Sequence, residues 1–188
     1  MDLPTQRITA ICQRITAIWR TAFVFSLALL IIGCADQRNK PECSDIFESR
    51  LDESGFDVLG RGIALHKKSR LTVTQCAVGQ KLVNYRCRGE ALKLNWDDAM
   101  AYAAEVADKT GESWRLPTKA EMPKLLETKC INPAANPFVF PDLEVANFWT
   151  KSKGLHQEIF RCSAYTYQGR VFCRQARDIP QPFLLVKE

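Results

Sequence analysis

Six cysteines follow residue 40 in a chain of 188 residues, and they constrain the fold more than any other feature: Cys43, Cys76, Cys87, Cys130, Cys162 and Cys173. Eight cysteines in all are too many for a reduced cytosolic protein of this size unless they hold metal. Only His66 and His156 could assist a metal site, and the later cysteines lack zinc-type Cys-x-x-Cys spacing. We therefore expect disulfides and an exported protein.

The N-terminus supports export. Three arginines precede an apolar run over residues 22–33, which is about twelve residues long, whereas a membrane-spanning helix needs roughly twenty. The run ends in Ile31-Ile32-Gly33-Cys34, which resembles a bacterial lipobox. We predict a lipoprotein signal peptide over residues 1–33 and a lipidated Cys34, with a retained anchor helix as the alternative.

Residues 34–56 are expected to form a lipidated tether and a short helix. Ser44 is placed to cap that helix, which we expect to run through Ile46, Phe47 and Leu51 and to stop at Gly55. The folded domain then covers residues 57–188. Nearly half of the chain is apolar and a quarter is charged, which suits one globular domain.

The charge of the mature chain is unevenly distributed. Removing residues 1–33 leaves a net charge of +3, but eight basic residues and one acidic residue lie between Arg61 and Lys93, and four basic residues and no acid lie between Arg161 and Arg177. A basic ligand-binding face is one interpretation and an ordinary solvated surface is the other. The candidate ligand-binding residues are Lys67, Lys68, Arg70, Arg86 and Arg88.

Two disulfides can be argued from the residues. Cys76 and Cys87 bracket two short extended pieces joined by a turn, and so small a loop is easily closed. Cys162 and Cys173 flank the Gln168-Gly169 turn, which favours their pairing. A shift in hairpin register could instead place them on opposite faces, and Cys130 and Cys43 would then each pair with one of them.

One long helix and a second helix start are predicted. Asn95 caps a helix with an apolar stripe that begins at Trp96, and Gly111 ends it. Thr118 and Glu121 form a capping box for a second helix. Before that box, the residue ahead of Pro117 is pushed out of the helical region, so 114–116 should be extended.

Two neighbours in this extended segment have different expected roles. Trp114 would fill the core, and Arg115 would bind loop carbonyls or a carboxylate through its planar set of donors. Contact of Arg115 with a ligand is the alternative.

The second half of the domain reads as short strands: 140–141, 147–150, 159–166, 170–175 and 183–186. Gln168-Gly169 turns a hairpin between the third and the fourth. Helices first and antiparallel strands last predict a single α+β domain with two helices.

Several of these motifs, in this order, resemble the Lcl C-terminal domain family. They are Cys76-Ala-Val-Gly-Gln80 with Cys87, Trp96, the run Trp114-Arg115-Leu116-Pro117-Thr118 with Glu121, Phe140-Pro141, and Phe148-Trp149-Thr150. The resemblance covers about residues 57–188 and implies a C-type-lectin-like α+β fold stapled by disulfides. Pro123 and the closing strand Leu184-Leu-Val-Lys187 depart from the family pattern.

Catalytic signatures are missing from the sequence. We find no Gly-x-Ser-x-Gly elbow, no histidine clustered with a serine or cysteine, and no phosphate-binding glycine loop, so we expect no enzyme activity and no cofactor. For metal we also expect none: Asp142, Glu144 and Asn147 are the only late calcium candidates. Cys162 and Cys173 are only a faint hint of copper chemistry.

Two function classes remain. The resemblance implies a membrane-anchored, non-catalytic binding or adhesion module in the bacterial cell envelope, with anionic polysaccharide as the ligand and no nucleic acid partner. The alternative is a structural envelope lipoprotein that docks to another protein and has no glycan ligand. Ala35 after the lipidated cysteine favours the outer membrane by analogy with sorting rules.

Overall fold

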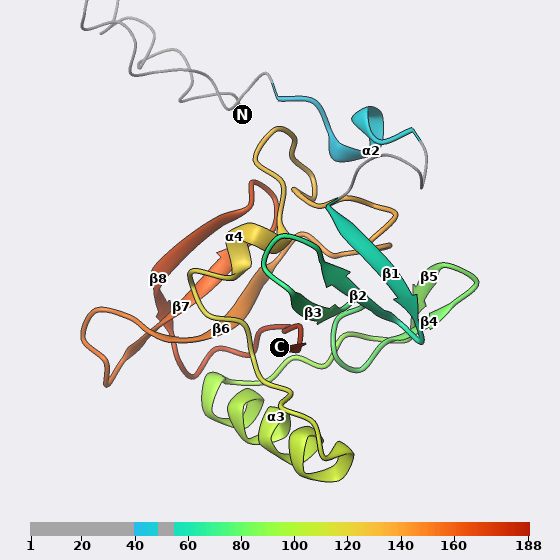
Figure 1. The fold of residues 1–188 in the computed structure, drawn as a ribbon. Helices are drawn as coiled ribbons and strands as arrows, with labels where there is room; N and C mark the ends of the chain where they lie inside the picture. Colours follow the sequence, from blue (N-terminus) through green and yellow to red (C-terminus); the bar gives the residue numbers. More distant parts are fainter. Residues whose placement is uncertain (1–39, 49–54) are drawn as a thin grey trace, which may run out of the picture. The chain divides into compact units, whose positions relative to one another are not determined.

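The computed structural model describes residues 40–48 and 55–188, which belong to one compact unit, Asn39–Glu188 (Figure 1). The predicted signal peptide and Cys34 lie outside the described residues, as do most of the tether and Leu51. Within the described part of the chain, no helix is long and apolar enough to cross a membrane.

Three antiparallel sheets form the framework. The largest has the order β1-β2-β3-β9 and consists of β1 (Phe56–Gly60), β2 (Ile63–His66), β3 (Leu71–Thr74) and β9 (Val186–Lys187). A hairpin pairs β4 (Lys81–Val83) with β5 (Arg86–Arg88). The third sheet has the order β6-β7-β8 and consists of β6 (Asn147–Lys153), β7 (Phe160–Tyr165) and β8 (Arg170–Ala176).

The strands β1, β2 and β3 correct the predicted order of elements, because they precede the main helix. They are short, and charged turns separate them, so their alternation is brief in the sequence. The β1–β2 turn needs three successive left-handed residues, Gly60, Arg61 and Gly62, with φ of 82°, 54° and 76°. An arginine at positive φ is uncommon, which hides the turn from residue preferences.

Helix α3 (Trp96–Thr110) matches the predicted long helix. The Asn95 side chain accepts a hydrogen bond from the Asp98 amide at 2.9 Å, and Gly111 ends the helix in the left-handed region at φ 67°. Its stripe buries Trp96, Ala99 and Ala103.

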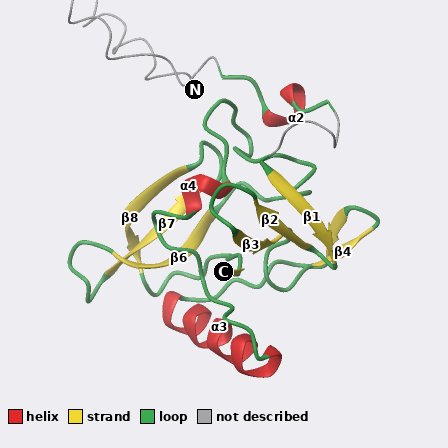
Figure 2. Ribbon diagram, in the orientation of Figure 1, coloured by secondary structure: helices red, strands yellow, loops and turns green. Residues whose placement is uncertain are grey.

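The other helices are shorter than predicted. Helix α2 (Cys43–Ile46) follows Glu42 rather than a Ser44 cap and ends before Phe47. Helix α4 (Met122–Leu125) is one turn, because Leu126 is already extended. Pro123 stands in the first turn of α4, where its missing backbone donor is tolerated. The Thr118–Glu121 capping box thus precedes a single helical turn rather than a full helix. Figure 2 shows how much of the domain is loop.

One predicted strand is wrong, and the strand predicted over 183–186 is reduced to Val186–Lys187. Residues 140–141 lie in a series of turns over 137–142, in which the Phe140 amide donates to the Asn136 carbonyl at 2.9 Å. Phe140 is nevertheless buried. The apolar Phe140 correctly indicated a buried position. It did not distinguish a strand from a turn, because the proline at 141 suits a turn as well as a strand end.

Two large apolar clusters fill the described part of the domain, and a third, small cluster consists of Cys43, Phe47 and Cys130. One large cluster lies beneath the large sheet and includes Val73, Phe140 and Phe148. The other large cluster lies beneath α3 and includes Trp114, Trp149 and Phe183. The C-terminal segment joins them, because Leu184 and Val186 belong to the first cluster and Phe183 and Leu185 to the second.

Three disulfides hold the described residues. Cys76–Cys87 ties β5 to the segment after β3, and Cys162–Cys173 joins β7 to β8. Cys43–Cys130 binds α2 to the loop after α4. The register question left open by the sequence is settled in favour of the hairpin pairing. The protein is an α+β domain stabilised by disulfides.

Candidate functional site

The turn between β2 and β3, residues Lys67–Arg70, presents the densest group of predicted ligand-binding residues. The turn is closed by hydrogen bonds from the Lys67 amide to the Gly55 carbonyl at 2.8 Å and from the Arg70 amide to the His66 carbonyl at 2.9 Å. Arg70 has a left-handed φ of 58°. We call Lys68, Arg70 and Lys124 of α4 the basic turn site.

The pKa of His66 is affected by the positive charges of this site. Its pKa is lowered, first by burial and then by the nearby cations Lys124 and Lys68. Its Nδ1 lies 2.7 Å from the Ser69 hydroxyl, which orients the ring beneath the turn. Residues 66, 68 and 124 therefore share one electropositive neighbourhood, although Lys124 comes from a different element.

A surface hollow of about 390 Å³ adjoins the turn. Its lining residues are Ser69, Arg70, Leu71, Glu121, Lys124 and Glu188. Cations and carboxylates thus share the hollow. An anionic ligand would be attracted by Arg70 and Lys124 and repelled by the two glutamates, unless those glutamates are neutralised by a cation.

Arg115 neutralises one of these two negative charges. Its Nη1 donates to Glu121 Oε2 at 2.8 Å and its Nη2 to Glu121 Oε1 at 2.9 Å, and Nη2 also donates to Glu188 at 3.0 Å. Arg115 lowers the pKa of Glu121 from its ordinary 4.5 to about 2, with further help from hydrogen bonds at Thr118. The guanidinium is thereby engaged with carboxylates of the chain itself.

The capping box completes this arrangement. The Glu121 amide donates to the Thr118 hydroxyl at 3.1 Å, and the Thr118 amide donates to Glu121 Oε2 at 2.7 Å. Glu121 therefore binds the turn backbone and Arg115 at once. One carboxylate links the extended segment 114–116 to α4.

The other predicted ligand-binding residues are not brought to the same place. Lys67 pairs with Asp57 at 3.2 Å, and Arg86 pairs with Asp142 at 2.5 Å. The hairpin lies at the opposite end of β2: a Cβ on Gly62 would be 3.5 Å from the Leu82 side chain. Four residues of strand, about 13 Å, separate that end from Lys67.

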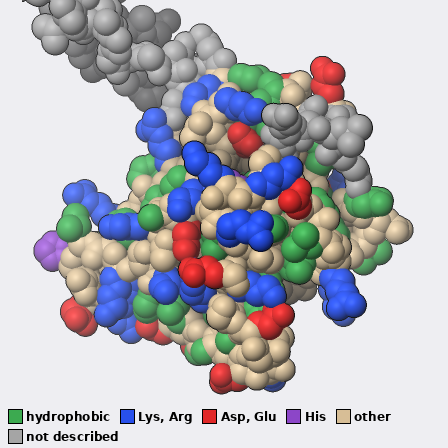
Figure 3. Space-filling model, in the orientation of Figure 1, with side chains coloured by type: hydrophobic (Ala, Val, Ile, Leu, Met, Phe, Trp, Pro, Cys, Tyr) green, Lys and Arg blue, Asp and Glu red, His purple; other side chains and the backbone are tan. Residues whose placement is uncertain are grey.

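Arg88 lies on this second patch, opposite Lys81 in the β4–β5 register. Figure 3 shows Lys and Arg over much of the visible face with acidic side chains among them, so the surface there is mixed rather than one continuous basic face. The predicted face is thus divided into a turn and a hairpin. Sequence reasoning missed Lys124, whose only signal was its place three residues after the capping-box glutamate.

Most of the residues that carry the resemblance to the Lcl C-terminal domain family lie in the core. Trp96, Trp114, Leu116 and Trp149 lie in one cluster. The Trp96 Nε1 donates to the Thr150 carbonyl at 2.7 Å and the Trp149 Nε1 to the Leu94 carbonyl at 2.8 Å. Both buried indoles thus have partners.

Two prolines of these motifs, Pro117 and Pro141, lie outside the helices and strands. The Pro117 carbonyl accepts from the Lys151 amide at 2.8 Å, which ties the extended segment to β6. Pro141 lines a cavity beside β1.

The calcium candidates bind cations of the chain. Asp142 contacts Arg86 and also accepts from the Cys87 amide at 3.0 Å, while Glu144 pairs with Lys93 at 3.0 Å. Asn147 begins β6. Across residues 40–48 and 55–188 no group of three or more His, Cys, Asp or Glu side chains is placed to hold a metal ion.

Comparison with family models gives one result for this chain. The model of the Lcl C-terminal domain matches residues 62–186. No curated protein and no solved structure matches the sequence.

Proposed function

Because the chain belongs to the Lcl C-terminal domain family, which indicates an adhesion-type module, we propose that it is a non-catalytic, extracytoplasmic binding protein anchored in the bacterial envelope by a lipid on Cys34. Its proposed ligand is an anionic polysaccharide. The outer membrane is the proposed location, and neither a cofactor nor nucleic acid is part of the proposal.

The observation that carries the ligand class is the basic turn site. Lys68 and Arg70 are exposed, and Arg70 and Lys124 line the same hollow. The pKa of the nearby His66 is lowered first by burial and then by the charges of Lys124 and Lys68. Counterion release from a polyanion would favour binding to such a group. Arg115 pairs with both neighbouring carboxylates, Glu121 and Glu188, and neutralises one of their two charges, which reduces their repulsion of an anion.

Retention of the full chain on immobilised heparin, in a non-ionic detergent, tests this proposal. The double variant Lys68→Gln/Arg70→Asn removes two charges; asparagine tolerates the left-handed φ of position 70. We expect elution at clearly lower salt than the unmodified chain. The matched control Lys109→Gln/Lys119→Gln removes two exposed charges elsewhere and should elute close to the unmodified chain.

If both double variants eluted at equally lowered salt, retention would depend only on the net charge of the protein. That result would contradict a defined binding site. Retention that does not depend on salt would contradict ionic binding altogether, since exposed charge interactions are screened by salt.

Docking to another envelope protein is the second candidate, and one observation favours it. A cavity of about 360 Å³ beside β1 is lined by Phe56, Asp57, Val58, Gly60, Gln75, Leu82, Tyr85, Phe138, Val139 and Pro141. Two of its lining side chains, Val58 and Tyr85, are large, apolar and exposed, as are their chain neighbours Leu59 and Val83. An apolar partner would bind there in a salt-insensitive way, and Leu82→Asp would abolish its capture while leaving heparin retention unchanged.

A further inference from the structure

The connection between β6 and β7 exposes large apolar side chains. Leu155 is 64% exposed and Ile159 is 56% exposed, and on the neighbouring strand β8 the Phe172 side chain is 47% exposed. Solvated loops rarely need such residues, and a group of them with polar surroundings is typical of an interaction site. We call Leu155, Ile159 and Phe172 the apolar tip.

The loop of the apolar tip is held firmly on β8. A Cβ on Gly154 would lie only 2.3 Å from the Cys173 carbonyl oxygen, so the loop backbone packs directly on the strand between Phe172 and Arg174. The Gly154 amide donates to the Phe160 carbonyl at 3.0 Å, and the Arg177 amide to the Ile159 carbonyl at 3.0 Å. The apolar side chains are thus presented by a hydrogen-bonded turn.

The sequence around this tip is basic. Between Lys151 and Arg177 the sequence has six basic residues and one acid, Glu158. Two of the six are engaged within the domain: Arg161 is buried with its guanidinium 4.3 Å from the Trp96 ring centroid, and Arg177 pairs with Asp97 at 2.7 Å.

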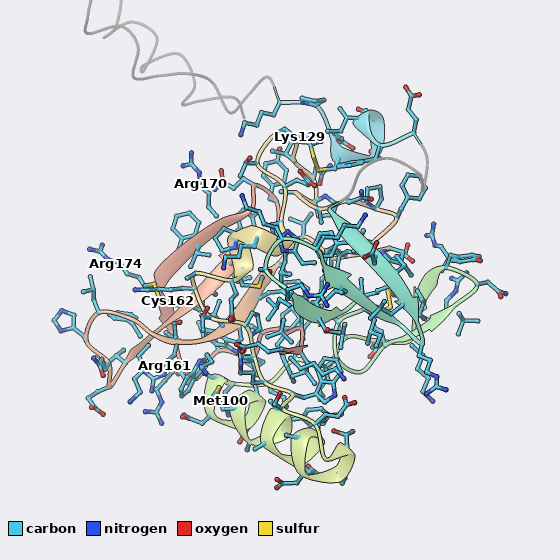
Figure 4. The ribbon with its side chains drawn as sticks, viewed as in Figure 1. Met100, Lys129, Arg161, Cys162, Arg170 and Arg174 are labelled. Carbon is cyan, nitrogen blue, oxygen red and sulfur yellow. A yellow bond between two sulfur atoms is a disulfide. The ribbon has the colours of Figure 1, made fainter. Side chains whose placement is uncertain are left out.

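Four basic side chains of this stretch are exposed: Lys151, Lys153, Arg170 and Arg174. Figure 4 shows Arg170 and Arg174 projecting from β8 away from the sheet. Lys153 and Arg174 adjoin the apolar tip, because Lys153 precedes Gly154 and Arg174 follows Cys173, on which Gly154 packs. Arg170 lies at the other end of β8, opposite Tyr165.

We propose that this face docks on a lipid bilayer with anionic headgroups. Leu155 and Ile159 would enter the boundary between headgroups and acyl chains, as the apolar residues of interfacial segments do, and Lys153 and Arg174 would lie at the phosphates. With an acidic protein partner on the same cations, Leu155 would not reach the acyl chains of a bilayer. The inference rests on the proposed lipid anchor, which would keep the domain next to a membrane.

Tryptophan fluorescence in vesicles tests this orientation. The full chain, carrying either Leu155→Trp or Tyr85→Trp, is reconstituted into phosphatidylglycerol vesicles with and without brominated acyl chains. Leu155 and Tyr85 are both 64% exposed, so Tyr85→Trp is a matched control away from the apolar tip. We expect the added emission of Leu155→Trp to be blue-shifted and quenched by the brominated lipid, and that of Tyr85→Trp to be unaffected.

The outcomes separate the two proposals. Loss of the full chain from sedimented vesicles would overturn the anchor, whereas retention without quenching at position 155 would overturn the docking face alone. Quenching at position 85 but not at position 155 would show that a different face of the domain contacts the bilayer, and would overturn the proposed docking face. Equal quenching in phosphatidylcholine vesicles, or no decrease with Lys153→Gln/Arg174→Gln, would overturn the requirement for anionic lipid.

Discussion

Arg115 and Glu121 form a two-point ion pair, with Nη1 to Oε2 at 2.8 Å and Nη2 to Oε1 at 2.9 Å. The pair crosses the junction between the extended segment 114–116 and α4. The same Arg115 residue exchanges backbone hydrogen bonds with Val186, so it connects the junction to the last strand as well. A single arginine therefore links three parts of the chain that are distant in sequence.

The first prediction concerns this pair. Arg115→Lys should lower the melting temperature, because an ammonium cannot donate to both carboxylate oxygens in this planar geometry. Hydrogen bonds to charged groups contribute about 1.5–3 kcal/mol each, so a loss of that order in the free energy of unfolding is expected. Urea unfolding measures it. A stable Arg115→Lys variant that has lost heparin retention would instead assign Arg115 to the ligand site.

The pH dependence of stability gives a second prediction. The pKa of Glu121 is lower in the folded chain, about 2 against an ordinary 4.5. The contribution of the ion pair to the free energy of unfolding is therefore fully present above pH 4.5. It should disappear as the pH falls from 4.5 towards 2, because the carboxylate then takes up a proton. Glu121→Gln should flatten that part of the stability curve. An unchanged curve in this variant would show that other carboxylates cause the acid sensitivity.

The third prediction is for Trp114. Its side chain is 9% exposed and packs in the same cluster as Leu116 and Phe183. Trp114→Ala should cost about 3–5 kcal/mol through the cavity it leaves, which is a large share of the stability of a domain. Thermal unfolding and the yield of folded protein measure the loss. A variant that keeps the melting temperature of the unmodified chain would contradict a core role for this residue.

The fourth prediction ranks two disulfides. Cys43–Cys130 spans a sequence separation of 87 and Cys162–Cys173 one of 11. On the chain-entropy account, Cys43→Ala/Cys130→Ala should cost about 4.5 kcal/mol and Cys162→Ala/Cys173→Ala about 3 kcal/mol. Urea unfolding of the two double variants gives the order. Peptide mapping without reduction checks the pairs themselves, and a bridge from Cys76 to any residue but Cys87 would refute the pairing.

The fifth prediction is for the anchor. Cys34→Ser should leave the precursor unprocessed and unlabelled by a clickable palmitate analogue, because the thiol is the proposed acceptor of the lipid. Persistent labelling of this variant would refute the lipobox interpretation. Cys43→Ser is the matched control: it also removes a cysteine near the N-terminus and should keep the label.

The parts of the fold that depend on local chemistry could be predicted from the sequence. Asn95 and Gly111 are residues that caps require, and both ends of α3 were predicted correctly. Thr118 and Glu121 likewise form the predicted reciprocal hydrogen bonds, but the helix after them stops within one turn at Leu126, which is extended and packs with Leu125 in the core.

The parts that depend on distant contacts could not be predicted. A closing strand was predicted over 183–186, but β9 is only Val186–Lys187, because only these two residues lie opposite Val73 and Thr72. The same holds for the candidate site. Lys68 and Arg70 stood out by charge, but the nearness of Lys124 and the pairing of Arg86 with Asp142 appear only when the chain is folded.

The bridge between Cys43 and Cys130 also determines where a mechanical pull would enter the domain. Tension applied through a lipid on Cys34 would travel along the backbone to Cys43 and pass across the sulfur bridge to Cys130, in the loop after α4. Two hydrogen bonds run beside that bridge, from the Cys43 amide to the Ile131 carbonyl at 2.8 Å and from the Ile131 amide to the Pro41 carbonyl at 3.0 Å. The force would therefore not act on Phe56 and β1. Without the bridge, β1, as the edge strand, would be the first strand to separate from its sheet. A domain held this way can be dragged by a bound polymer while the basic turn between β2 and β3 keeps its shape.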